Sequence, residues 1–381
     1  MENRRCRICG SIELEPITTL PNYPMVAGPV TKVPKTAPTC DLEVGLCHHC
    51  GTCVLLNEDI DSLVYNDDYT SSNIAYGQVK GMDEKTDRFV EFVGRARKPM
   101  HSKVLEIGCY EGTFMGLLEE RYRFNMTGCE PCVAIAEEAR RKGYDVVPRA
   151  FNPTDYSGLD MIVARNILEH IPAPRQFVRD IASTLKQDGS LVVEVPAGEH
   201  FISNGILGTI VPEHPCYFGE RSLERLLEGY FAVVMVEEHG ATIRALASFP
   251  QDSNDSKDTT VYATRLKGGG QMRQARYDAV WRTIRKERVD VFGANTCALE
   301  LIATGAIRVA RIGRVYDDDP RKWDRYLVNT NLAVFPRNVL KRRLFRPPRK
   351  VLVCSYTHRR SIADYITKQN NIAVMLYGDD E

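Results

Sequence analysis

Short apolar runs alternate with amphipathic stretches through the middle of the chain. Residues 104–107 are predicted to form a buried strand, 108–112 a tight glycine loop, 113–122 a helix and 126–129 a second strand. Together these elements make one βαβ unit. In such units a ligand lies outside the carboxyl ends of the strands, above the first loop.

The same alternation continues on both sides of this unit. It predicts a doubly wound α/β sheet for the middle of the chain, and a weaker repeat of strand, glycine loop and helix, marked by Gly293, in the last third. Gly293 either contacts a ligand or only packs. The predicted helices are 78–96, 133–142, 173–185 and 272–287, and the predicted strands are 145–147, 160–164, 189–195 and 233–237.

These patterns divide the chain into four expected parts. They are a metal-binding module (1–57), a helical lid or connector (58–100), a cofactor-binding domain (101–237) and a C-terminal Rossmann-like substrate domain (238–381).

Composition excludes several classes of protein. Lysine plus arginine equals aspartate plus glutamate at 50 each, whereas a dedicated nucleic-acid binder usually has a basic excess. The sequence contains no apolar run of about 18 residues and no apolar stretch behind the N-terminus, so we expect a cytoplasmic protein without a membrane partner. It does not indicate the oligomeric state.

Six of the twelve cysteines lie in the first 53 residues. Cys6 and Cys9 form one C-x-x-C turn and Cys47 and Cys50 another, each followed by a glycine. Four thiolates on two such turns complete a tetrahedral shell, for which zinc is the usual ion. With no open position the zinc would be structural. The alternative is a small domain of reduced cysteines without metal.

The glycine loop lacks the G-x-G-x-x-G spacing of dinucleotide enzymes. Glu106 ends the first strand, Gly108 and Gly112 bound the loop, and Glu130 lies 22 residues after Gly108, near the distance at which an acid meets ribose hydroxyls. An acid, a close-approach loop and a ribose carboxylate suit S-adenosylmethionine, which has an amino acid tail and no phosphate. A glycine loop after a strand is otherwise often only a turn.

Other polar residues are candidates for the same site. Asn166 and His170 follow the strand 160–164 and open toward the ligand edge, although His170 could instead be satisfied at a helix end. Pro212 and Pro215 bracket Glu213 and His214, and we expect them to hold this pair in an extended segment with the two side chains on opposite faces. A lid before the cofactor domain would carry Tyr69, Ser71, Ser72 and Tyr76; a solvated connector is the alternative.

The chain resembles the deoxysugar C-methyltransferases, which act on nucleotide-linked 4-keto sugars in bacterial antibiotic and surface-polysaccharide pathways. The resemblance rests on CRICG and LCHHCG, YTSS, EIGCYEG, IVPEHPCYF, and FGANTCALELIA with YDDDPRKWDRYL, in that order. It implies zinc ligands at Cys6, Cys9, Cys47 and Cys50, a lid tyrosine at Tyr69 and a catalytic pair at Glu213 and His214.

Two departures from the family pattern bear on the substrate. Val211 and Pro212 stand where members usually read Tyr-His, so a tyrosine expected near the sugar is missing. The loop GCYEG replaces a more usual Asn-Asp form. The loss of the tyrosine at Val211 keeps sugar O-methylation as an alternative.

Methyl transfer to a sugar carbon needs a base near neutral pKa to remove a proton beside a ketone, and donors to steady the enolate oxygen. We assign His214 as the base, Glu213 as the group that orients this base or a sugar hydroxyl, and Tyr69 or His170 as the donor. The expected protein is an α/β class I methyltransferase that uses S-adenosylmethionine, is stabilised by zinc, and methylates position 3 of a nucleotide-linked keto sugar. Sugar O-methylation, and cofactor binding without catalysis, are the alternatives.

Overall fold

The computed structural model describes residues 4–26, 28–34, 37–57, 80–249, 260–284, 287–340, 348–356 and 358–377. For residues 80–83, 233–234 and 260–270 it describes the backbone alone. Within these ranges no helix is long and apolar enough to cross a membrane.

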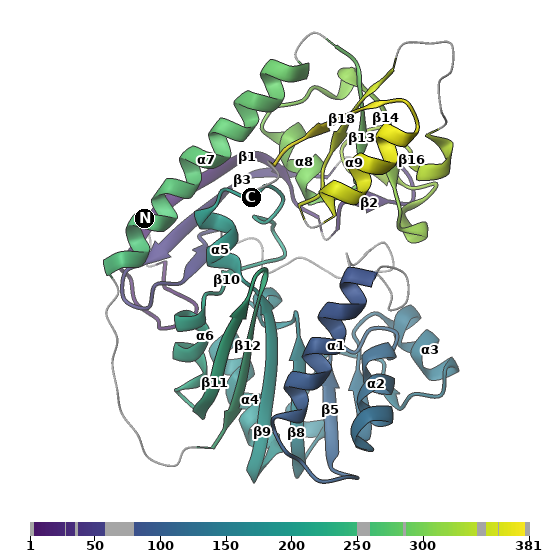
Figure 1. Cartoon of the computed structure of the whole chain (residues 1–381). Coiled ribbons are helices and arrows are strands. Elements are labelled where there is room, and N and C mark those ends of the chain that lie inside the picture. The colour runs from purple at the N-terminus through teal and green to yellow at the C-terminus, as the bar shows by residue number, and fades with distance from the viewer. Residues whose placement is uncertain are drawn as a thin grey trace.

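A seven-stranded sheet forms the lower half of the molecule in Figure 1. Its order is β11-β12-β9-β8-β5-β6-β7. The last five strands are parallel to one another, and β12 is antiparallel to both β9 and β11. The strands are β5 (Lys103–Ile107), β6 (Asn125–Cys129), β7 (Val146–Val147), β8 (Leu159–Arg165), β9 (Leu185–Pro196), β11 (Ala232–His239) and β12 (Thr242–Ser248).

Helices cover both faces of this sheet, as doubly wound packing requires. Apolar side chains of α1, α2 and α3 pack in one cluster on one face, and those of α4 and α6 in another cluster on the other face. The helices are α1 (Lys80–Gly94), α2 (Thr113–Tyr122), α3 (Val133–Arg141), α4 (Pro174–Thr184) and α6 (Glu220–Leu227), with short 3₁₀ turns η2 (Pro153–Asp155) and η3 (Leu168–His170).

The C-terminal third forms a second, five-stranded sheet in which every strand is parallel to its neighbours. It occupies the upper right of Figure 1, in the order β16-β14-β13-β17-β18. The elements are β13 (Val289–Phe292), α8 (Thr296–Ala303), η4 (Val309–Arg311), β14 (Ile312–Asp317), η5 (Pro320–Lys322), β16 (Val334–Pro336), η6 (Arg337–Val339), β17 (Lys350–Val353), α9 (Arg359–Lys368) and β18 (Ile372–Met375).

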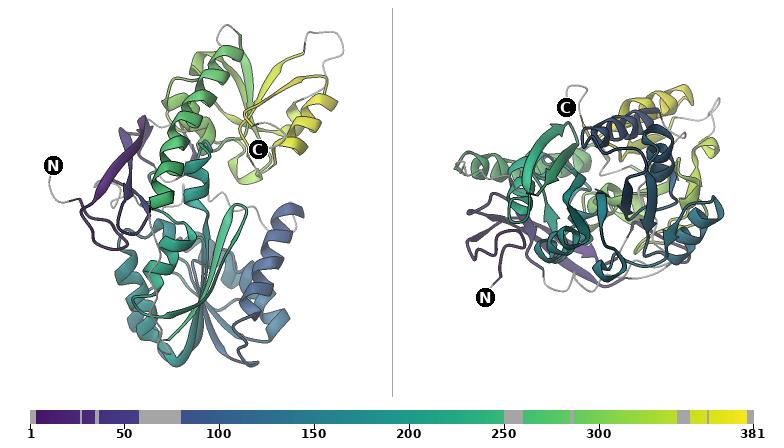
Figure 2. Two further views of the ribbon diagram at one scale, coloured as in Figure 1. Left: turned by 60° about the vertical axis from the view of Figure 1, so that its left-hand side comes forward. Right: turned by 90° about the horizontal axis from the view of Figure 1, so that it is seen from below.

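The N-terminal strands join the two halves. They form a sheet in the order β1-β3-β4-β10, and a short ladder pairs β2 with β15 of the C-terminal part. Figure 2 shows these strands along one side of the molecule, beside the long helix α7. The elements are β1 (Leu14–Pro24), β2 (Val30–Thr31), β3 (Thr39–Cys47), β4 (Cys53–Leu55), α5 (Gly198–Ser203), β10 (Cys216–Tyr217), α7 (Thr260–Ile284) and β15 (Tyr326–Leu327).

The N-terminal strands share hydrophobic cores with both larger sheets. Leu42 and Val44 pack in one cluster with Val291 and Leu352 of the C-terminal sheet. Val54 packs in another cluster with residues of the seven-stranded sheet. Because it belongs to two cores, this segment couples the two sheets.

Candidate active site

The glycine loop after β5 follows the geometry that its sequence predicts. Gly108 and Gly112 have left-handed φ angles of 70° and 80°. A Cβ on Gly108 would meet the side chain of Ile167, and one on Gly112 would meet the ring of Tyr144. Glycine is therefore required at both positions, both by the left-handed backbone and by the close packing of Ile167 and Tyr144.

Glu130 lies beside this loop at the end of β6. Its Oε2 accepts the Tyr110 N–H at 3.1 Å and its Oε1 accepts the Cys132 N–H at 2.9 Å. Burial raises the pKa of the carboxyl, and the two backbone bonds oppose that rise. Each oxygen can accept a second hydrogen bond, as a ribose hydroxyl would require.

Glu106, near the end of β5, carries a buried carboxyl group that lacks a hydrogen bond. It is 3% exposed, and its Oε2 has no hydrogen-bond partner among the described residues. Burial raises its pKa to about 8, while the charge of Arg165 acts in the opposite direction. A cation beside this oxygen would provide the electrostatic partner that the described residues do not supply. The α-ammonium of S-adenosylmethionine is such a cation, so the residues fit this cofactor.

Asn166 begins the loop after β8. Its φ is 53°, a left-handed value that asparagine tolerates, and its N–H donates to the Glu194 carbonyl at 2.7 Å. The side chain of Glu194 is fully buried between Arg165 and Arg244, at 3.1 and 2.8 Å. This ion-paired group fixes the end of β8 beside the glycine loop.

The segment with Glu213 and His214 differs from its expected extended form. Pro212 and Glu213 occupy a turn, and the His214 N–H donates to the Val211 carbonyl at 3.2 Å. Proline excludes the residue before it from helix, but its own fixed φ also suits the first corner of a turn. The carboxylate of Glu213 accepts the N–H of Gly28 from the N-terminal part.

His170 and His214 face each other across two loops. Their rings cross at 79° with centroids 4.6 Å apart, and the ring of Tyr217 lies 6.3 Å from that of His214. The Nδ1 of His170 bonds the carbonyl oxygen of Glu213 at 3.0 Å. Because a carbonyl only accepts, Nδ1 carries the proton and Nε2 the lone pair.

Burial sets the protonation of this group. It lowers the pKa of His170 to about 4, and it lowers the pKa of His214 well below its usual value with help from His170. Both rings are therefore neutral at pH 7. The lone pair of His214 is unprotonated, although burial also makes this ring a weaker base than a free imidazole. Burial also raises the pKa of Glu213 to about 7, although the hydrogen bond from the Gly28 N–H acts to lower it.

The structure thus brings three of the four expected catalytic residues together: His170, Glu213 and His214. The fourth, Tyr69, lies outside the described residues, as do Ser71, Ser72 and Tyr76. The loop with His170 also packs against the glycine loop, since Ile167 lies above Gly108.

The N-terminal sheet supports the turn that carries His214. Strand β10, directly after Pro215, pairs antiparallel with β4, and the Leu55 N–H donates to the Pro215 carbonyl at 3.0 Å. With the bond from Gly28 to Glu213, the N-terminal part holds the turn from two sides.

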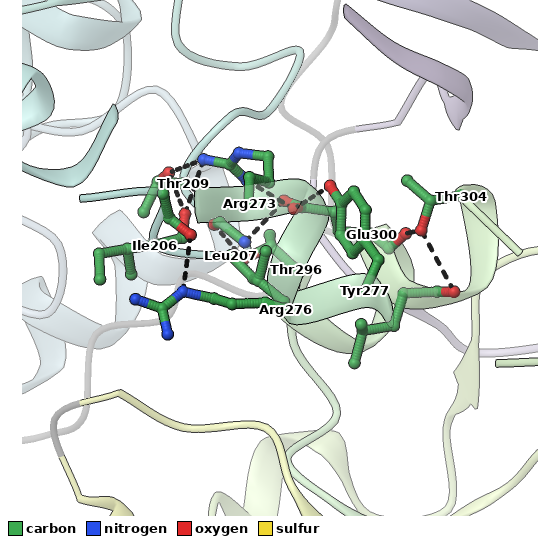
Figure 3. Close-up of polar contacts among 12 residues, drawn as sticks. Ile206, Leu207, Thr209, Arg273, Arg276, Tyr277, Thr296, Glu300 and Thr304 are labelled. Atoms are coloured by element: carbon green, nitrogen blue, oxygen red, sulfur yellow. Dashed lines mark hydrogen bonds and ion pairs between the residues drawn. The ribbon is translucent and has the colours of Figure 1, made fainter. Parts of the chain in front are cut away.

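Residues 206–209, a few positions earlier, are anchored by α7 and α8 (Figure 3). Arg273 donates to the carboxylate of Glu300 at 2.5 Å and to the Ile206 carbonyl at 2.7 Å. Glu300 also accepts the Tyr277 hydroxyl and the Gly208 N–H, each at 2.7 Å. The C-terminal half thus fixes the approach to the turn.

The four expected zinc ligands also meet. Their sulfurs lie within 4.8 Å of one another, with Cys6 to Cys50 and Cys9 to Cys47 each at 3.5 Å. Four thiolates at the usual zinc distance would be about 3.8 Å apart. Gly10 and Gly51 have φ angles of 77° and 78° and close the two turns. The donor set therefore fits zinc.

Two features of the site are missing from the sequence-based prediction. Glu169 lies beside the two histidines, with its Oε2 buried and unpartnered among the described residues. Arg321 of the C-terminal half donates to the Tyr110 hydroxyl in the glycine loop. The position of Glu169 directly before His170 was a usable signal in the sequence. The hydrogen bond between Arg321 and Tyr110 joins residues 211 positions apart and left no such signal.

Comparisons with known proteins agree with this geometry. Residues 79–234 match a family model described as a methyltransferase domain. No curated protein matches the chain.

Several solved structures are similar to the seven-stranded part. The PH0226 protein from Pyrococcus horikoshii aligns at 14% identity over 45% of this chain and 92% of its own, with a TM-score of 0.39. An S-adenosylmethionine-dependent methyltransferase from Clostridium acetobutylicum aligns at 11% identity over 47% and 94%, with a TM-score of 0.36. A TehB-like methyltransferase from Corynebacterium glutamicum aligns at 16% identity over 47% and 90%, with a TM-score of 0.34.

The sheet, the glycine loop and the family match define a class I methyltransferase domain with a Rossmann-like α/β fold. The chain is a methyltransferase that uses S-adenosylmethionine.

Proposed function

We propose that this enzyme transfers the methyl group of S-adenosylmethionine to a carbon atom, position 3 by resemblance, of a nucleotide-linked 4-keto deoxysugar. The observation that carries the proposal is the pair of facing rings of His170 and His214, 4.6 Å apart, beside the glycine loop. Oxygen methylation needs only one base, whereas carbon methylation needs a base and a group that steadies an enolate.

In the proposed reaction His214 takes the proton from the sugar carbon beside the ketone. The C–H bond electrons form an enolate, whose carbon attacks the methyl carbon in line with the sulfur. The S–CH₃ bond breaks, and S-adenosylhomocysteine leaves with that electron pair. Tyr69 donates to the enolate oxygen, since the one proton of neutral His170 is held by the Glu213 carbonyl, and Glu213 orients the base or a sugar hydroxyl.

The cofactor is proposed to lie across the glycine loop. Glu106 would meet its ammonium, Glu130 its ribose hydroxyls, and Gly108 and Gly112 would allow the backbone to approach. Asn166 would line the adjacent edge. Ile167, three residues before His170, lies against Gly108, which supports placing the methyl group near the two histidines.

The N-terminal module is proposed to hold one structural zinc ion at Cys6, Cys9, Cys47 and Cys50. Its role would be to fix the β4 to β10 pairing that carries the His214 turn. The C-terminal half is proposed to bind the nucleotide of the substrate. In support, Gly293 has a φ of 111° in the loop before α8, and Asp317 accepts the Ala294 N–H at 2.8 Å at the same sheet edge.

Hydrogen exchange tests the proposal. The protein is incubated in heavy water with a nucleotide-linked 4-keto-6-deoxy sugar and S-adenosylhomocysteine, and the mass of the recovered sugar is measured. We expect uptake of one deuterium, lost in His214→Ala and kept in His200→Ala. Methyl transfer from S-adenosylmethionine without any exchange would assign the reaction to oxygen.

A further inference from the structure

Glu169, His170 and His214 form a second group with the chemistry of a metal site. One ligand atom from each lies within 4.8 Å of the others. Glu169 and His170 end the turn η3 after β8, and His214 comes from the turn before β10. The cysteine cluster, by contrast, belongs to the N-terminal turns.

The orientation of His170 suits metal binding. Its Nδ1–H donates to the Glu213 carbonyl at 3.0 Å, which leaves the lone pair on Nε2. Histidines that bind metals usually donate their second ring nitrogen to a carbonyl or carboxylate in this way, which fixes the tautomer and the ring.

The buried carboxyl group of Glu169 is a second indication of a bound cation. It is 2% exposed, and its Oε2 has no hydrogen-bond partner among the described residues. An unpaired buried carboxyl oxygen is costly, at about 1–3 kcal/mol. It lies in one group with the rings of His170 and His214, so a divalent cation bound by the three side chains would satisfy it.

We propose that Glu169, His170 and His214 bind a divalent transition-metal ion of the class that prefers nitrogen and oxygen donors, such as Zn²⁺ or Co²⁺. Imidazole and carboxylate favour these ions over Mg²⁺ and Ca²⁺. At the usual bond lengths the three donors of a tetrahedral site are about 3.4 Å apart, so the group, whose ligand atoms lie within 4.8 Å of one another, closes by at most about 1.4 Å. Three protein ligands leave a position open.

The bound ion has a consequence that rests on the proposed function. A lone pair of His214 given to a metal is no longer available to take a proton from a sugar carbon. The ion therefore inhibits the exchange reaction, and the metal-free group is the reactive form.

Cobalt distinguishes this site from the four cysteines. Protein loaded with one equivalent of Zn²⁺ per chain, which fills the tighter four-thiolate site first, is titrated with Co²⁺. We expect one Co²⁺ per chain with visible ligand-field bands and no added near-ultraviolet thiolate charge transfer. Glu169→Gln and His214→Ala, from different loops, should each weaken Co²⁺ binding at least tenfold, while thermal unfolding checks that each variant folds.

His200→Ala is the matched control. His200 also has a carboxylate neighbour, Glu238 at 3.8 Å, but lies outside the group. Equal Co²⁺ affinity in all variants, thiolate bands alone, or no uptake would overturn the proposal. Exchange should fall as Co²⁺ saturates the site, and exchange that persists at saturation would remove the inhibitory role. Absence of exchange in the metal-free protein would count against the proposed function, while the cobalt spectrum still decides the site.

Discussion

Arg321 donates a hydrogen bond to the hydroxyl of Tyr110, and its guanidinium lies 5.7 Å from the centroid of the same ring. Asp319 holds the guanidinium through two of its nitrogens, both at bonding distances of 2.9 Å or less. Tyr110 has a φ of 51°, a left-handed value that is unfavourable for a bulky side chain. The C-terminal half thus holds the cofactor loop in a conformation that Tyr110 alone disfavours.

Arg321→Met should weaken S-adenosylmethionine binding by about 5- to 30-fold, since a hydrogen bond and a cation–π contact are each of order 1 kcal/mol. Calorimetric titration measures the change. Arg314→Met is the control, because Arg314 lies over Phe335 at 5.4 Å without contacting the loop. Equal losses in both variants would mean that the contact does not position the cofactor loop.

Glu106 should make the stability of the cofactor-free protein depend on pH. Burial raises its pKa from 4.5 to about 8, so its contribution to stability is complete below pH 4.5 and is lost as the pH rises through 8. Glu106→Gln keeps a neutral group at every pH. We expect it to raise the free energy of unfolding by about 1–3 kcal/mol at pH 9 and to leave it nearly unchanged at pH 4.

The same substitution should weaken cofactor binding at least tenfold, because the ammonium loses its carboxylate. Denaturant unfolding across the pH range, together with cofactor titration at pH 8, measures both effects. A variant that binds the cofactor normally would show that the orphaned oxygen of Glu106 does not face the ligand.

Cys47→Ser should remove the bound zinc and much of the folded protein, because metal binding in such modules contributes of order 10 kcal/mol to folding. Loss of the N-terminal sheet would also release the turn with His214. Metal analysis and unfolding by circular dichroism measure the two losses. Cys40→Ser is the control, since Cys40 contacts Met25 and lies outside the cluster. Purified parent protein that folds normally without any metal would refute the zinc assignment.

Arg273→Met should destabilise the protein by about 3–5 kcal/mol, because it leaves the carboxylate of Glu300 buried without its charge partner. Both side chains are at most 3% exposed. Arg282→Met on the same helix should have little effect, since Arg282 donates to a backbone carbonyl at the surface. Chemical denaturation of the two variants gives the comparison, and similar midpoints would mean that the Arg273–Glu300 pair adds little stability.

The middle of the fold was predictable because its signals are local. The predicted helix 113–122 has the same bounds as α2, and the strand 104–107 differs from β5 by one residue. Strand β12 was missed, because it is buried on both faces and so lacks an alternating pattern. The N-terminal sheet was also missed, since its strands owe their stability to two distant cores.

The site was predictable to the extent that its residues follow strand ends. Gly108, Glu130 and Asn166 come directly after parallel strands, whose carboxyl ends share one edge, and His170 follows in the loop after β8. The turn at Pro212 and Glu213 was predicted wrongly: the fixed φ of Pro212 is compatible with a turn, and the N–H of Gly28 and strand β4 hold the segment in it. Long-range contacts of this kind leave no local pattern.

The position of the transferred methyl group tests the central claim most directly. The protein is given S-adenosylmethionine with a ¹³C-labelled methyl group and a nucleotide-linked 4-keto-6-deoxy sugar, and the product is analysed by carbon NMR. We expect the label in the chemical-shift range of a methyl group bonded to carbon, with coupling to the ring carbon next to the ketone. A label in the methoxy range would contradict carbon methylation and assign the enzyme to the sugar O-methyltransferases.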